Sequence, residues 1–284
     1  MQPMLNIATR AARQAGEHII RSFDRGMNLH ISTKGQNDFV SDVDKQAETI
    51  IIETLHKAYP NHAILAEESG QHYQDDYEWV IDPLDGTTNF LHNHPQFCVS
   101  IALKYQKRLE LAVIYDPLRQ ELFTASRGEG TQLNDRRIRV SGLPSLNGAL
   151  IGTGFPFRIQ HHLETYLKTF GALFPLVADI RRAGSAALDL AYVAMGRLDG
   201  FWEIGLKEWD MAAGVLLIQE AGGFVSDFEG GDDYLKTGNI ICGTPKVFKG
   251  ILQTIQPHLP PILKKSPTHE LKTLELTRKI NRPS

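Results

Sequence analysis

The sequence is poor in cysteine and has no long apolar run. Its two cysteines, Cys98 and Cys242, each lie in an apolar stretch. A zinc site built on cysteines needs more ligands at closer spacing, so buried free thiols in a reducing compartment are expected. No apolar run approaches the roughly 20 residues that span a bilayer. The N-terminus lacks a basic segment followed by an apolar run, so no signal peptide is expected. We therefore predict a cytoplasmic protein that does not bind membranes.

The sequence also lacks a strong net charge. The net charge is −3 over 284 residues, which gives no field that would draw the chain to nucleic acid, so no direct sequence-specific nucleic-acid binding is expected. Hydrophobic residues make up 42% and charged residues 22%, as in ordinary globular proteins. The length suits one large domain or two closely packed halves.

The first half of the chain combines helical and strand-like patterns. Apolar residues recur at helical spacing over 4–22 and 42–58, and Pro60 ends the second helix. Short runs separated by turn residues then predict an antiparallel sheet, with strands at 79–81, 97–103, 111–115, 121–125 and 138–140. We expect an α+β half over about 1–147.

The second half alternates strands with helices. Strands are predicted at 149–152, 198–203, 223–226 and 239–242, and helices at 161–174, 185–195, 209–221 and 245–256. This alternation predicts a layered α/β half over about 148–262, so that residues 1–262 form a single domain. Small Ala212, Ala213 and Gly214 would let the helix at 209–221 pack closely against a neighbour.

The remaining segment, 263–284, is basic. Two acids, Glu270 and Glu275, oppose six basic residues: Lys264, Lys265, Lys272, Arg278, Lys279 and Arg282. A solvated or loosely docked helix and a partner-binding arm both fit this composition.

Asp82 and Asp85 carry the strongest chemical signal. A strand runs into Asp82, and Pro83 keeps Asp82 extended, while Asp85-Gly86 favours a turn. The two carboxylates therefore leave the strand end close together. Like charges this close repel unless a cation lies between them or one is protonated, and hard divalent metals suit oxygen ligands.

The residues that follow could bind a phosphate. Gly86 lets backbone approach a ligand, and successive amides at Gly86-Thr87-Thr88 can hold an anion. Taken alone, Asp82 to Gly86 is equally a surface turn, since aspartate, proline and glycine all form turns. Two other segments add acids: Glu67-Glu68 before Gly70, and Asp210 in the first turn of a helix.

Three motifs together resemble the inositol monophosphatase family, in the superfamily that also contains fructose-1,6-bisphosphatases and lithium-sensitive nucleotide phosphatases. The motifs are 67–70, 79–90 and 209–214, and the segment 34–44 is similar to the family's mobile-loop motif. Ser41 stands where many members have threonine. The resemblance runs from about Met4 to Ile262 and implies the layered αβαβα sandwich of that family. Residues 1–20 and 181–210 look most like a bacterial branch, the SuhB proteins.

The resemblance implies a Mg²⁺ site with two or three ions per subunit. Glu67, Asp82 and the Leu84 carbonyl would hold the first ion. Asp82, Asp85 and Asp210 would hold the second, and a weaker third ion would lie near Glu67 and water.

The resemblance also implies how water and substrate are held. Asp44 and Thr87 would orient the attacking water, with Glu68 behind them, and the Gly86 and Thr87 amides would hold the phosphate. The residues expected to line the alcohol pocket are Asp85, Arg181, Ser185, Ala186 and Glu203.

Other signals are interpreted as structural. His92-Asn93-His94 lacks a third ligand, so we interpret it as a loop or core feature. No nucleophile elbow surrounds Ser185, although Asp189 lies nearby in sequence. Arg181-Arg182 fits an ion-paired or interface role better than a nucleic-acid patch.

Two functions follow from the resemblance. The first is a Mg²⁺-dependent phosphomonoesterase, expected as a homodimer, that hydrolyses myo-inositol 1-phosphate or a similar small phosphorylated alcohol. Within that chemistry, another sugar phosphate, a nucleotide 3′-phosphate and histidinol phosphate remain open. The second is a transcription antitermination factor for ribosomal RNA operons that binds NusA and RNA polymerase, with catalysis secondary.

Overall fold

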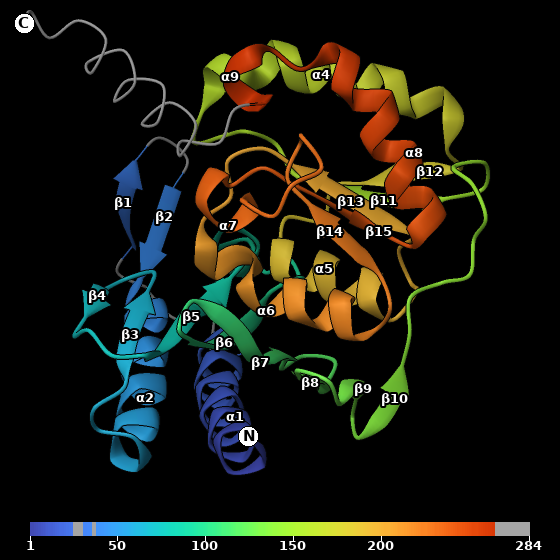
Figure 1. Cartoon of the computed structure of the whole chain (residues 1–284). Coiled ribbons are helices and arrows are strands. Elements are labelled where there is room, and N and C mark those ends of the chain that lie inside the picture. Colours follow the sequence, from blue (N-terminus) through green and yellow to red (C-terminus); the bar gives the residue numbers. More distant parts are fainter. Residues whose placement is uncertain (25–30, 36–37, 265–284) are drawn as a thin grey trace, which may run out of the picture.

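The chain folds into five layers that alternate helices and sheets (Figure 1). The computed structural model describes residues 1–24, 31–35 and 38–264. The basic segment predicted at 263–284 lies almost wholly outside the described residues. Among the described helices, none is long and apolar enough to cross a membrane. This layering confirms the αβαβα sandwich expected from the sequence.

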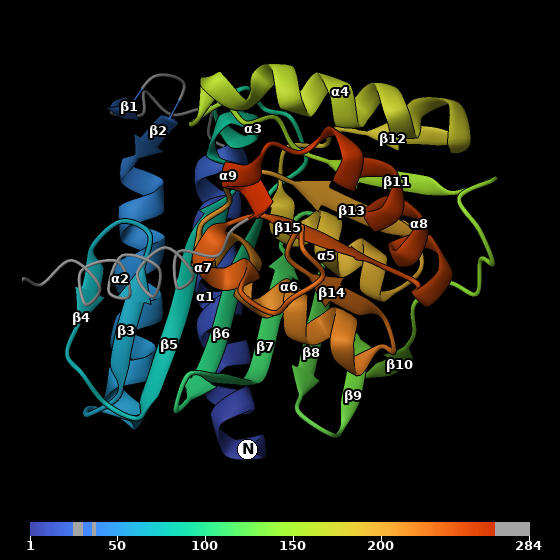
Figure 2. The same ribbon diagram turned by 45° about the horizontal axis from the view of Figure 1, so that its top comes forward.

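The first two layers come from the N-terminal half. Helices α1 (Gln2–Asp24) and α2 (Asp42–Ala58) pack on each other and cover one face of an eight-stranded sheet of order β10-β9-β8-β7-β6-β5-β3-β4 (Figure 2). Its strands are β3 (Ala63–Ala66), β4 (Gly70–His72), β5 (Tyr77–Asp85), β6 (Cys98–Tyr105), β7 (Arg108–Asp116), β8 (Glu121–Ser126), β9 (Gly130–Leu133) and β10 (Arg136–Ile138). A separate hairpin pairs β1 (Ile31–Gly35) with β2 (Asp38–Ser41), and the short helix α3 (Thr87–Leu91) follows β5.

Helices α5 (Ala186–Ala194) and α6 (Glu208–Glu220) form the middle layer. Helix α6 is buried along most of its length, and one apolar cluster joins these helices to both sheets. A Cβ added at Gly214 would lie 2.4 Å from Leu190 Cβ, so the absence of a side chain lets α6 approach α5. The close packing expected from the small residues at 212–214 is confirmed.

The last two layers are a five-stranded mixed sheet and the helices that cover it. The sheet order is β12-β11-β13-β15-β14, formed by β11 (Leu150–Thr153), β12 (Asp179–Arg181), β13 (Gly200–Glu203), β14 (Phe224–Ser226) and β15 (Ile240–Gly243). Helices α4 (Leu163–Leu173) and α8 (Pro245–Ile255) pack on each other, and α8 covers the sheet. The short helices α7 (Tyr234–Thr237) and α9 (Pro261–Lys264) complete the described chain, with 3₁₀ turns at Gln160–His162, Phe174–Leu176 and Gln256–His258.

The long periodic elements match the sequence predictions most closely. All six predicted helices occur, and their ends agree within two residues. The prediction of a purely antiparallel first sheet was wrong, because β3 pairs with β5 in parallel. The strands that were not predicted are β1, β2, β3, β4, β9 and β12, since three to five residues carry too little periodic pattern to identify a strand.

Candidate metal centre and its cavity

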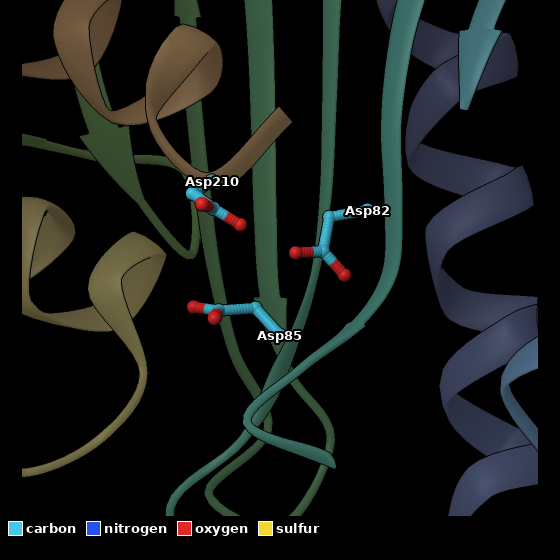
Figure 3. A group of neighbouring side chains, drawn as sticks. All are labelled: Asp82, Asp85 and Asp210. Atoms are coloured by element: carbon cyan, nitrogen blue, oxygen red, sulfur yellow. The ribbon is translucent and has the colours of Figure 1, made fainter. Parts of the chain in front are cut away.

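Three aspartates from two distant parts of the chain meet in one place. Asp82 and Asp85 come from the end of β5, and Asp210 comes from the first turn of α6. One carboxylate oxygen from each lies within 4.8 Å of the others, and Figure 3 shows the three groups facing a common space. The structure therefore brings together three of the acids predicted as metal ligands.

An irregularity in β5 allows Asp82 and Asp85 to share this space. In a regular strand, residues three apart point to opposite faces of the sheet. The prediction ended this strand near Asp82, but β5 continues through Pro83 to Asp85, and its pairing with β6 shifts register between the two aspartates. Such an irregularity redirects side chains, as β-bulges do near active sites.

Burial and mutual repulsion make these carboxylates hard to ionise. Burial, followed by the neighbouring charge of Asp210, raises the pKa of Asp85 to about 7. Burial raises the pKa of Asp210 to about 6, although Arg158 opposes this rise. The pKa of Asp82 is raised well above its ordinary value by burial and then by the charges of Glu67, Asp85 and Asp210. A divalent cation among these oxygens would relieve the repulsion.

Asp85 is held by hydrogen bonds from α5. The Ser185 hydroxyl and the Ala187 amide both donate to Asp85 Oδ2, each at 2.7 Å. Among the described residues, no donor contacts the other oxygen, Oδ1, which leaves its lone pairs for a ligand. The carboxylate is thus fixed by one oxygen while the other remains able to coordinate.

Glu67 lies beside the three aspartates, whereas Glu68 does not line their cavity. Glu67 follows β3 and lines the same cavity, and Arg158 Nη2 lies 3.9 Å from its Oε1. The Glu68 amide donates to Glu48 Oε2 at 2.8 Å, and Glu68 is not among the residues that line the cavity. The absence of Glu68 from the cavity lining is compatible with the indirect role expected for it.

Asp44 and Thr87 form the pair that the sequence predicted for the attacking water. The Thr87 hydroxyl lies 2.7 Å from Asp44 Oδ1 and 3.1 Å from the Leu84 carbonyl. Asp44 is fully buried at the start of α2, where its Oδ2 accepts from both the amide and the hydroxyl of Ser41. Burial raises the pKa of Asp44 against the effect of these hydrogen bonds. A buried carboxylate with a raised pKa therefore accepts a hydrogen bond from a threonine that lines the cavity.

A cavity of about 440 Å³ opens over these groups. Gly86 lies in its wall with a φ of +101°, and a Cβ there would come within 2.8 Å of the Gln96 carbonyl. Only glycine fits this turn, which places the start of α3 against the cavity. The turn predicted to bind phosphate therefore adjoins the acids.

The structure also places most of the predicted alcohol-pocket residues in the cavity. Asp85, Ser185, Ala186 and Glu203 line it. A Cβ added at Gly154 would lie 2.0 Å from Glu203 Oε1, so the bare backbone of Gly154 makes room for this acid.

Arg181 is the exception among the predicted pocket residues. It lies on strand β12 at the edge of the sheet, exposed and ion-paired with Asp179, and it is not among the residues that line the cavity. The next residue, Arg182, lines the cavity instead and stacks over the Phe155 ring. The sequence does not show which of the two arginines lines the cavity, because the direction of each side chain depends on where strand β12 ends.

Several residues that line the cavity were not predicted from the sequence. Asp189 comes from α5 and Arg158 from the loop after β11, and Thr153, Phe157 and Leu206 join them. His92, interpreted above as a loop or core feature, also lines the cavity, whereas His94 does not. These residues lie in separate segments and share no local motif, so only the tertiary structure identifies them.

The donor set suits a hard divalent metal. Oxygen ligands from several carboxylates and a backbone carbonyl are typical of Mg²⁺ and Ca²⁺ sites, and Mg²⁺ is usual where phosphates are handled. The raised pKa values of Asp85 and Asp210 indicate a site that is electrostatically incomplete without a cation. Beside the Gly86 turn, the arrangement can bind a metal and a phosphate together.

Comparisons with known proteins point to the same chemistry. Residues 1–259 match the model of the inositol monophosphatase family. The chain is 60% identical over 271 residues to a protein of Pseudomonas aeruginosa named Nus factor SuhB, covering 93% of this chain and 100% of the relative.

Solved structures agree in fold. The structure of the extragenic suppressor protein SuhB from Bartonella henselae is 46% identical, with a TM-score of 0.87, over 89% of this chain and 98% of that chain. The inositol monophosphatase from Anabaena is 38% identical, with a TM-score of 0.80, over 92% of this chain and 97% of that one.

Proposed function

The chain belongs to the inositol monophosphatase family, and from this premise we propose that it is a Mg²⁺-dependent phosphomonoesterase. Its substrate would be myo-inositol 1-phosphate or a similar small phosphorylated alcohol, cleaved by an activated water. The observation that carries this proposal is the meeting of Asp82, Asp85 and Asp210 beside the Gly86 turn in one cavity. A phosphoryl transfer of this kind needs mainly positioning and charge neutralisation, which such a cavity can supply.

The metal would be held by Glu67, Asp82, Asp85, Asp210 and the Leu84 carbonyl, with two or three ions per subunit. Bound Mg²⁺ supplies a lowered pKa for water and charge stabilisation for the leaving oxygen. Ser185 and Ala187 keep the Asp85 carboxylate in one orientation, so that its position does not depend on the ligand. The protein's contribution is thus a rigid frame of oxygens.

Asp44 and Thr87 would orient the attacking water. Thr87 Oγ1 donates to Asp44 Oδ1, so its lone pairs can accept a hydrogen bond from a water in the cavity. The burial that raises the pKa of Asp44 makes this carboxylate a better proton acceptor than an exposed aspartate. Proton movement from the water toward Asp44 through Thr87 would strengthen the nucleophile.

The phosphate and the alcohol would occupy different walls of the cavity. The Gly86 and Thr87 amides would bind the phosphate oxygens. Glu203 and Ala186 would face the alcohol, with Arg182 in place of the expected Arg181. Burial, followed by the charges of Asp210 and Asp189, raises the pKa of Glu203 well above its ordinary value. A buried acid of this kind can hydrogen-bond hydroxyl groups.

The Asp85→Asn variant tests the proposal. It should abolish Mg²⁺-dependent phosphate release while leaving the circular dichroism spectrum unchanged, because the amide cannot supply a charged ligand. Asp135→Asn, in the exposed turn between β9 and β10, is the matched control and should keep full activity. Near-normal turnover by Asp85→Asn would exclude the proposed site. A panel of inositol, sugar, histidinol and nucleotide 3′-phosphates would define the alcohol, and preference for a nucleotide would overturn the inositol assignment.

An exposed apolar face supports a homodimer. Leu163, Leu167, Phe174 and Leu176 lie along α4 and the 3₁₀ turn after it, and all four are exposed. Large apolar side chains gathered on one face are unusual for a monomer. We expect two copies to pack through this face. Sedimentation of Leu167→Glu should then give a monomer, whereas a dimer that is unchanged in this variant would exclude the α4 face.

A second candidate function is suggested by the P. aeruginosa relative, whose name is Nus factor SuhB. We propose as the alternative that this chain acts in ribosomal RNA antitermination by binding NusA and RNA polymerase. The Asp85→Asn variant separates the two proposals. Retention of the cellular antitermination function by this variant would make catalysis secondary, and failure of the wild-type chain to capture NusA in a pull-down would exclude the alternative.

A further inference from the structure

Arg158 places a positive charge against two of the expected metal ligands. Its Nη1 lies 3.3 Å from Asp210 Oδ2, and its Nη2 lies 3.9 Å from Glu67 Oε1. The guanidinium is 4.9 Å from the centre of the Phe157 ring, and the side chain is 23% exposed where it lines the cavity. A cation supplied by the chain itself therefore bridges the β11 loop, the end of β3 and the start of α6.

The contacts of Arg158 are of a kind that a metal ion can replace. Mg²⁺ coordinates oxygen at about 2.1 Å, whereas both guanidinium nitrogens lie more than 3 Å from their carboxylates. Both separations exceed the roughly 2.7–2.9 Å of a usual charge-assisted hydrogen bond, so the guanidinium is not tightly hydrogen-bonded to either carboxylate. Arg158 also lies in a loop after β11, from which a long side chain can rotate toward solvent.

We propose that Arg158 is an internal counter-ion that competes with the divalent metal for Asp210 and Glu67. This inference rests on the proposed metal-dependent function and concerns how the metal site is regulated. Arg158 contacts Asp210 Oδ2, the oxygen that also accepts from the Lys207 amide, so its competition with a metal on these carboxylates is electrostatic: two cations this close repel each other. Arg158 therefore weakens metal affinity, and it offsets part of the acidic charge in the metal-free protein.

Removal of the Arg158 charge should tighten metal binding. In calorimetric titrations with Mg²⁺ and Mn²⁺, we expect the Kd of Arg158→Gln to fall about fivefold relative to wild type, because no neighbouring positive charge opposes the metal. Arg158→Lys keeps the charge on a different head group and should give an intermediate Kd. The control Arg197→Gln removes a surface pair with Glu121, outside the cavity, and should bind metal as wild type does.

Thermal denaturation gives a second readout. Without metal, Arg158→Gln should melt below wild type because four clustered acids lose a counter-ion, and Mg²⁺ should raise its Tm by more than it raises that of wild type. A residue that only connects the loop to α6 would lower the Tm without tightening metal binding. If Arg158→Gln does not fold, Arg158→Lys still tests the inference, since any variant that weakens the ion pairs must bind metal more tightly.

An unchanged or higher Kd in the folded Arg158 variants would overturn the inference. That failure can be distinguished from failure of the proposed function. If wild type binds no divalent metal, or if Asp85→Asn does not abolish the binding, the proposed metal site itself is wrong. If wild type binds Mg²⁺ through Asp85 and the Arg158 variants bind equally well, only the competition is wrong.

Discussion

Helices α2 and α6 begin with the same capping hydrogen bond, but their first turns serve different chemistry. Each helix carries an aspartate in its first turn, Asp44 or Asp210, that accepts a hydrogen bond from the backbone amide three residues earlier. The distances are 2.9 Å from the Ser41 amide and 2.6 Å from the Lys207 amide. Both aspartates are buried, and burial raises the pKa of each. As helix caps, the two residues are nearly equivalent.

The two aspartates differ in what the rest of the fold places opposite them. Asp44 receives two hydroxyl groups, from Ser41 and Thr87, which suits orientation of a water. Asp210 faces Asp82 and Asp85, with Arg158 alongside, which suits a cation. A capping carboxylate therefore acquires its role from its tertiary neighbours.

The largest effect is expected from Asp210→Asn. The amide oxygen can still accept from Lys207, so the helix cap survives, but a charged metal ligand is lost. We expect the Mg²⁺ affinity to fall by at least about 100-fold. Mutation of residues that only hydrogen-bond to a metal ligand already lowers metal affinity by about 10- to 100-fold. Calorimetric titration measures this, with the thermal unfolding of the apoprotein as the control for folding. Tight Mg²⁺ binding by the variant would remove Asp210 from the metal site.

Asp44→Asn should separate catalysis from metal binding. The amide conserves shape but cannot accept a proton, so we expect kcat to fall by about 100-fold, in the range of general-base effects. The Mg²⁺ Kd should stay within about twofold of wild type because Asp44 contacts no metal ligand directly. Steady-state kinetics and titration together check the contrast with Asp210. Equal losses of metal affinity in both variants would show that Asp44 and Asp210 do not have different roles.

Metal binding should weaken in acid. The pKa values of about 7 for Asp85 and about 6 for Asp210 lie above the ordinary value of 3.8, so protons compete with Mg²⁺ below neutral pH. We expect the Mg²⁺ Kd to rise by about tenfold or more from pH 8 to pH 5. Titrations at several pH values measure this, and a flat profile would show that protonation of these acids does not oppose the metal.

The same raised pKa values make the stability of the metal-free protein depend on pH. Because the folded-state pKa is raised, these groups contribute stability that is fully present below pH 3.8 and is lost as the pH rises through about 6 to 7. The gain in Tm on adding Mg²⁺ should therefore be larger at pH 8 than at pH 5. A gain independent of pH would contradict this assignment.

The smallest expected effect is a difference in stability between the N-terminal caps of α2 and α6. The Ser41 hydroxyl accepts from the Val43 amide and donates to Asp44, whereas exposed Lys207 offers only backbone groups to its helix. Ser41→Ala should lower the free energy of unfolding by about 1 kcal/mol, while Lys207→Ala should change it by less than about 0.5 kcal/mol. Denaturant unfolding measures both. Equal effects would show that the Ser41 side chain does not cap α2.

The long helices and the group of acids could be predicted without the fold. Helix α2 was predicted at its observed ends because its apolar periodicity and Pro60 both act within a few residues. Asp82, Asp85 and Gly86 were identified because they are adjacent in sequence, and a motif of adjacent residues can be read without knowing the fold. Glu67 and Asp210 were added through the family resemblance.

How these residues meet could not be predicted, because it depends on contacts between distant parts of the chain. The register shift in β5 turns Asp82 and Asp85 toward the same space, although their spacing of three would separate them in a regular strand. Arg158 and Asp189 enter the cavity from segments without a motif, and Arg182 rather than Arg181 faces it. The periodicity of apolar residues indicates only which face of a helix or strand is buried, and not which segment packs against that face. The partner across a cavity depends on packing between segments far apart in the chain.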